Sequence, residues 1–121
     1  MIENLQGFPD DTVAFACRGH VTAHEYETVL IPRVDQALKA HDKVCVYYQI
    51  GDDFGGIDPG AVWDDIKTGM QHRQQWERIA VVTDVGWIRS TMRAFGFLIP
   101  CEMKMFPMAE MAQAREWISA R

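Results

Sequence analysis

Two segments of the chain are almost continuously apolar, and they limit the possible folds more than any other feature. They are KVCVYYQI at residues 43–50 and RIAVV at residues 78–82. Strands that are buried on both faces of a parallel sheet have this composition. Parallel strands are joined by long crossovers that usually contain a helix. The sequence therefore predicts an α/β fold with a mixed, mostly parallel sheet.

Three further strands complete the predicted sheet of about five strands. MIENLQGF (1–8) and TVAFACRG (12–19) are separated by the turn signal PDD, which predicts a hairpin at the start. CEMKMF (101–106) alternates between apolar and polar residues, as an outer strand with one wet face does. With four helices, the predicted order is β-β-α-β-α-β-α-β-α.

The segment 21–41 contains the clearest predicted helix start. Thr22 and Glu25 have the spacing of a capping box, in which each side chain bonds to a free amide of the first turn. Pro32 lies inside the helical pattern and lacks the amide that would bond to Thr28, so the helix is predicted to be kinked. Further helices are predicted over 58–76, with Asp58 as N-cap, from about Asp84 to 98, and over 108–120.

Size and charge restrict the function classes. The 121 residues form one predicted domain, and the net charge of −5 argues against nucleic-acid binding, which draws on a basic surface. Three cysteines without C-x-x-C spacing favour a reducing cytoplasm. No segment resembles an export signal or a membrane span, although contact with the inner membrane surface stays open. No cofactor is expected.

The ordered segments GHVTAHEYETVLIPRV, DFGGIDPGAVWDDIK, ERIAVVTD and FPMAEMAQAREWI resemble the bacterial SpoIIAA-like proteins. The resemblance runs from about Leu5 to Ile118. These proteins have the STAS fold of sulfate transporters and anti-sigma-factor antagonists, and are described as similar to CRAL-TRIO (Sec14-type) lipid-binding domains. The resemblance implies a small α/β domain, with ligand binding and membrane association suggested. Anti-sigma-factor antagonists carry a phosphorylatable serine after the central strand, but here IGDDFGGIDPG (50–60) has no hydroxyl residue to accept phosphate.

The acidic, glycine-rich segment 51–65 admits three interpretations. As a calcium loop starting at Asp53 it places Gly55 and Ile57 where oxygen ligands belong. As a phosphate loop it lacks the lysine and the hydroxyl residue of a Walker motif. The favoured interpretation is a loop whose glycines turn the chain after a strand, and which borders a ligand crevice at the carboxyl ends of the strands.

The sequence offers no positive evidence for catalysis. It contains neither a G-x-S-x-G nor an H-E-x-x-H motif. His20 and His24 lie at a helix start, where exposed histidines are more common than metal ligands. We therefore expect neither a metal site nor an enzyme.

The helix predicted from about Asp84 to 98 combines cations with large apolar residues. Such a helix binds anionic head groups or lies in a membrane interface. The alternative is an ordinary helix on the sheet, with its arginines in water and its tryptophan covering the edge of the core.

The sequence thus favours a non-catalytic domain that binds an apolar or amphiphilic ligand, with peripheral membrane contact. The residues expected to line the ligand pocket are Tyr48, Phe54, Trp63 and Ile66. The residues expected to contact the membrane or an anion are Trp87, Arg89, Arg93 and Phe97. The alternative is a STAS-type protein-interaction module without the phosphorylatable serine. An exposed strand edge also favours a homodimer.

Overall fold

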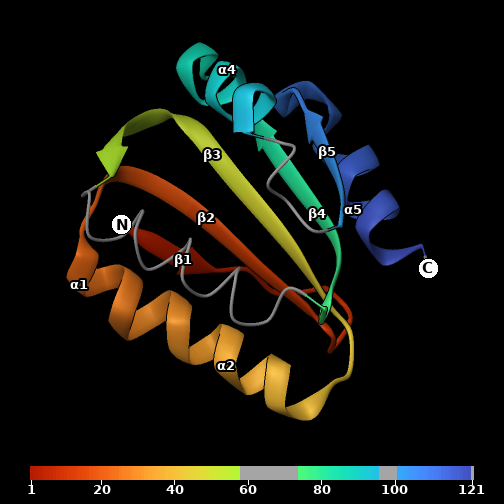
Figure 1. Cartoon of the computed structure of the whole chain (residues 1–121). Helices are drawn as coiled ribbons and strands as arrows, with labels where there is room; N and C mark the ends of the chain where they lie inside the picture. Colours follow the sequence, from red (N-terminus) through yellow and green to blue (C-terminus); the bar gives the residue numbers. More distant parts are fainter. Residues whose placement is uncertain (58–73, 96–100, 121) are drawn as a thin grey trace.

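The computed structural model describes residues 1–57, 74–95 and 101–120. Its centre is a five-stranded sheet in the order β1-β2-β3-β4-β5. The strands are β1 (Ile2–Asn4), β2 (Thr12–Val21), β3 (Val44–Ile57), β4 (Trp76–Thr83) and β5 (Glu102–Phe106). β1 pairs with β2 in the antiparallel direction, and the other three pairs are parallel (Figure 1). The predicted mixed, mostly parallel sheet of five strands is confirmed.

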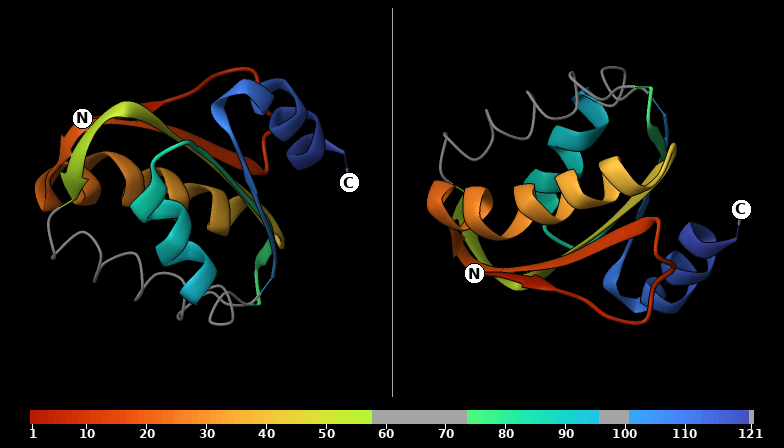
Figure 2. Two further views of the ribbon diagram at one scale, coloured as in Figure 1. Left: turned by 90° about the horizontal axis from the view of Figure 1, so that it is seen from above. Right: turned by 90° about the horizontal axis from the view of Figure 1, so that it is seen from below.

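Helices cover both faces of the sheet. They are α1 (Ala23–Glu25), the π-helix η1 (Tyr26–Leu30), α2 (Ile31–Ala40), α4 (Gly86–Phe95), the 3-10 helix η3 (Met108–Glu110) and α5 (Met111–Ser119). Figure 2 shows α2 and α4 on one side of the sheet and α5 on the other. The helix predicted over 58–76 lies mostly outside the described residues, and at its end Trp76 belongs to β4 instead.

Each face of the sheet has its own core, because successive side chains of a strand point to opposite faces. The larger cluster lies between the sheet and α2 and contains Ile2, Val13, Phe15, Cys17, Val21, Tyr26, Leu30, Val34, Ala37, Leu38, Val44, Val46 and Trp76. The smaller cluster lies under α5 and contains Ala14, Cys45, Tyr47, Ala80, Val82, Ala114 and Ile118.

The first helical segment begins as predicted but passes Pro32 in an unexpected way. The Thr22 hydroxyl accepts a hydrogen bond of 3.1 Å from the Glu25 amide. A π-helical turn, η1, precedes the proline, and Pro32 falls in the first turn of α2. The Ile31 amide bonds to the Tyr26 carbonyl oxygen, five residues back, so the helix continues from η1 into α2 without a break.

The described part of the glycine-rich segment, residues 51–57, is not the loop that the sequence predicted. Residues 51–57 extend β3, which pairs with β2 up to Val21 opposite Ile57. The register shifts on both sides of Gly19, and Gly19 and Gly56 have φ angles of 55° and 140°. Residues with side chains rarely adopt these angles, so the glycines permit two irregular, bulged strands to stay paired. The predicted N-cap Asp58 lies outside the described residues.

Candidate functional site

The carboxyl ends of the four parallel strands meet at one edge of the sheet, which we call the carboxyl edge. Ligands of open α/β sheets bind at this edge. β2 and β3 reach it together, since Gly19 lies opposite Phe54 in the register. β4 reaches it at Thr83, directly before the start of α4. The candidate site is built from these segments.

An aromatic pair stands at the carboxyl edge. The rings of Phe54, on β3, and Trp87, on α4, are stacked with centroids 6.0 Å apart and planes inclined by 30°. Phe54 is half-buried and packs against the larger core cluster. Trp87 has 55% of its surface exposed. Phe54 thus anchors an indole ring that remains largely in solvent.

The start of α4 is fixed by hydrogen bonds from the strand end. The Thr83 hydroxyl accepts a bond of 3.1 Å from the Val85 amide. Asp84 accepts a bond of 3.1 Å from the Met108 amide through its carboxylate, which ties the segment after β5 to the same edge. These bonds hold the first turn of α4, and hence Trp87, in a defined position.

The two arginines of α4 have different surroundings. Arg89 is half-buried, and its Nη1 donates a bond of 3.0 Å to the Thr83 carbonyl oxygen. Arg93 is exposed in the last turn, and no hydrogen bond or ion pair to it is seen within residues 1–57, 74–95 and 101–120. A cation in this position is also favourable for the helix dipole. Within the part of the chain that the structure describes, Arg93 thus has no partner, whereas Arg89 is engaged with the backbone.

The structure describes five of the eight residues predicted for the site. Phe54 and Trp87, which were predicted for separate contacts, belong to one surface. Tyr48 is half-buried against the larger core cluster, and its ring centroid lies 6.2 Å from that of Phe15. Trp63, Ile66 and Phe97 lie outside the described residues, so the lining of the predicted pocket stays a prediction.

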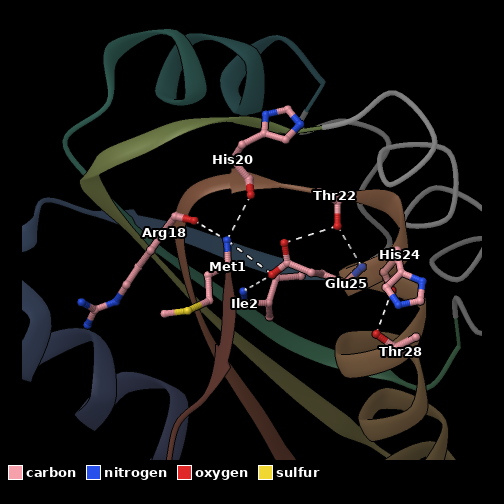
Figure 3. Close-up of polar contacts among 8 residues, drawn as sticks. All are labelled: Met1, Ile2, Arg18, His20, Thr22, His24, Glu25 and Thr28. Atoms are coloured by element: carbon pink, nitrogen blue, oxygen red, sulfur yellow. Dashed lines mark hydrogen bonds and ion pairs between the residues drawn. The ribbon is translucent and has the colours of Figure 1, made fainter.

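A polar network at the same edge was not predicted. The Met1 ammonium group donates to the carbonyl oxygens of Arg18 and His20 and lies 3.4 Å from the Glu25 carboxylate (Figure 3). The Ile2 amide donates to the same carboxylate at 3.0 Å. The capping-box spacing revealed the helical role of Glu25, but no local pattern indicates a partner at the start of the chain.

The network changes the acidity of Glu25. Burial raises the pKa of this carboxyl group, but bonds from the Ile2 amide, the ammonium group and the Thr22 amide outweigh it, and the pKa falls below its ordinary value of 4.5. The carboxylate is thus ionised at neutral pH. It joins the first strand to the start of the first helix.

Two structural findings concern metal sites and membrane-spanning helices. Among the described residues, no three His, Cys, Asp or Glu side chains gather in an arrangement suited to a metal ion. His20 and His24 are both exposed at the carboxyl edge. In the same residues, no helix has the length and apolar character needed to cross a membrane.

The sequence and the fold both resemble those of known proteins. The SpoIIAA-like family model matches residues 12–119. An uncharacterized protein with a SpoIIAA-like fold from Shewanella loihica superposes with a TM-score of 0.73 at 24% identity, over 98% of this chain and 92% of that chain. A search of curated proteins finds no match. The chain belongs to the SpoIIAA-like family.

Proposed function

We propose that this SpoIIAA-like protein is a non-catalytic domain that binds amphiphilic molecules with an anionic head group at its carboxyl edge. The membrane surface is the proposed source of these molecules. The observation that carries the proposal is the exposure of Trp87, which is 55% accessible while it stacks on Phe54. The similarity to CRAL-TRIO lipid-binding domains that the sequence suggests would also favour lipid binding, and it stays a prediction.

The aromatic pair suits a membrane interface. Tryptophan combines a large apolar body with one polar N–H group, and it favours the boundary between head groups and acyl chains. Phe54 holds the indole in place, so little side-chain entropy remains to be lost on binding. Tyr48, Trp63, Ile66 and Phe97 would extend the apolar contact.

The charges of α4 set the strength of the contact. A basic residue near an anionic membrane surface contributes about 1 kcal/mol. Arg93 is placed to make this contribution, and Arg89 supports the helix start through Thr83. The whole chain carries a net charge of −5, which opposes approach to an anionic surface. We therefore expect weak, reversible binding that needs both the aromatic pair and Arg93.

Vesicle flotation tests this proposal. Wild-type protein should float with vesicles of phosphatidylcholine and phosphatidylglycerol, and far less with phosphatidylcholine alone. Trp87→Ala and Arg93→Glu should each abolish most of the flotation. Lys39→Glu, which makes the same charge change at an exposed position of α2, should leave it unchanged. Absence of wild-type flotation, or equal loss in all three variants, would refute the proposal.

A protein-interaction module of the STAS type is the second candidate. Tryptophan and arginine are enriched among the residues that dominate protein interfaces, so the same surface would suit a protein partner. Residues 51–57 contain no hydroxyl group, so phosphorylation of a serine or threonine there is excluded chemically. A partner that binds wild type but not Trp87→Ala, together with absent flotation, would favour this candidate.

A further inference from the structure

The strand β5 forms one end of the sheet. It pairs with β4 on one side, and the part of the chain that the structure describes places no strand on its other side. Alternate backbone amides and carbonyls of an edge strand point outward and are ready to pair with another strand. The question is what this edge pairs with.

The side chains of β5 are divided between the two faces of the sheet. Glu102 and Lys104 are exposed on the α5 side, where the Lys104 ammonium group lies 5.4 Å from the centre of the Trp117 ring. Met103 and Met105 are half-buried on the opposite side. The exposed face of the edge thus carries one negative and one positive charge, two residues apart.

The charge of Glu102 is only weakly engaged within its own chain. Among the described residues it forms an ion pair with Nε of Arg78 at 3.9 Å, and the glutamate side chain is 57% exposed. An exposed pair of this length contributes little to stability. Arg78 meanwhile donates two bonds of 2.8 Å to the carbonyl oxygens of Trp117 and Ala120. Glu102 is therefore available to a second cation.

We infer that β5 pairs with β5 of a second copy of this chain, in an antiparallel two-fold arrangement centred on Met103. In this register Glu102 of each copy lies opposite Lys104 of the other, and both pairs are on the same face. Opposite charges that lie directly opposite each other stabilise an antiparallel strand pair. The strand is complementary to itself, as a two-fold contact requires.

The neighbouring registers are less favourable. A shift by one residue would place Glu102 and Lys104 of one copy on the opposite face of the joined sheet from those of the other copy, so these charges could not pair. Centring the pair on Lys104 or on Glu102 would bring identical charges directly opposite each other, which is destabilising. Charge therefore selects the register centred on Met103.

The geometry makes this inference independent of the proposed function. An antiparallel pair of edge strands reverses the strand direction in the second copy, so the two carboxyl edges lie at opposite ends of the joined sheet. The short strand contact also predicts a dimer that dissociates on dilution, because stable interfaces bury far more surface. A variant that remains monomeric should still float with anionic vesicles.

Charge exchange tests the pairing. In sedimentation velocity, the wild-type mass should rise from 13.8 kDa toward twice that value as concentration increases. Glu102→Lys and Lys104→Glu should each stay monomeric. An equimolar mixture of the two should dimerise, because each position then meets an opposite charge, and so should the double variant Glu102→Lys/Lys104→Glu. A monomeric wild type, or single variants that dimerise as well as wild type, would overturn the inference.

Cross-linking tests the register. Met103→Cys in a Cys101→Ala background places two thiols opposite each other, within the distance that a disulfide spans. Mild oxidation should convert this variant to covalent dimers. Lys104→Cys in the same background should cross-link much less. Preferential cross-linking through position 104 would contradict the register centred on Met103.

Discussion

Trp87 on α4 rests against Phe54 on β3, with the ring planes inclined by 30° and the centroids 6.0 Å apart. The contact joins the extended end of β3 to the first turn of α4. Among the large apolar side chains of the described residues, Met1 and Trp87 are the exposed ones. This relationship explains how a polar edge of the sheet presents a fixed aromatic surface.

The first prediction concerns the two tryptophans that the structure places differently. Trp87→Ala should lower the free energy of unfolding by only about 0.5–1.5 kcal/mol, the contribution of an aromatic pair. Trp76 is 8% exposed in the larger core cluster, and Trp76→Ala should cost about 3–5 kcal/mol. Urea unfolding measures both values. Equal costs would show that Trp87 is a core residue rather than a surface residue.

The second prediction compares two buried threonines. Thr12 is 2% exposed, and its hydroxyl has no hydrogen-bond partner among the described residues. Thr12→Val should therefore be neutral or stabilising by up to about 1 kcal/mol.

Thr83→Val is the matched control. Thr83 is fully buried, and its hydroxyl accepts the Val85 amide, which would lose its partner. We expect a loss of about 1–3 kcal/mol in the free energy of unfolding. Thermal or urea unfolding of the pair tests the contrast, and a destabilised Thr12→Val would contradict the account.

The third prediction concerns acid stability. The pKa of Glu25 is lower in the folded chain than its ordinary value of 4.5, so its contribution to stability is present above that value and disappears as the pH falls through the folded pKa. Glu25→Gln should therefore flatten the acid limb of a plot of stability against pH. Glu27→Gln, at an exposed position of η1, should leave the limb as in wild type. An unchanged slope in Glu25→Gln would disprove the role of the network.

The fourth prediction concerns thiol reactivity. Burial, with smaller effects of Cys45 and Glu102, raises the pKa of the Cys101 thiol to about 11. The thiolate is the reactive form, and at pH 8 only about one thousandth of the Cys101 side chains are ionised to the thiolate. Alkylation of Cys101 by iodoacetamide, followed by mass spectrometry, should accelerate about tenfold per pH unit up to that pKa. A plateau reached below pH 9 would contradict this prediction.

Much of the fold follows from local sequence patterns. The apolar segments 43–50 and 78–82 became adjacent parallel strands, and the Thr22–Glu25 spacing became a formed helix cap. Both signals are local, because burial on two faces and a free first-turn amide leave a residue pattern within a few positions.

Features that depend on contacts between distant segments were not predictable. Glycine and aspartate usually mark loops, so the continuation of β3 through residues 51–57 could not be recognised without the irregular partner strand around Gly19. The bond from the Ile2 amide to Glu25 likewise joins segments that are far apart in the sequence. For the site, sequence identified Phe54 and Trp87 individually, and only the structure joined them.

Quenching of tryptophan fluorescence by brominated lipids tests the central claim most directly. With anionic vesicles that carry bromine in the acyl chains, wild-type emission should fall, and the quenching should be clearly weaker in Trp87→Phe although the other three tryptophans remain. Quenching as strong in Trp87→Phe as in wild type, or wild-type emission that does not respond to the vesicles, would contradict the claim that Trp87 enters the membrane interface.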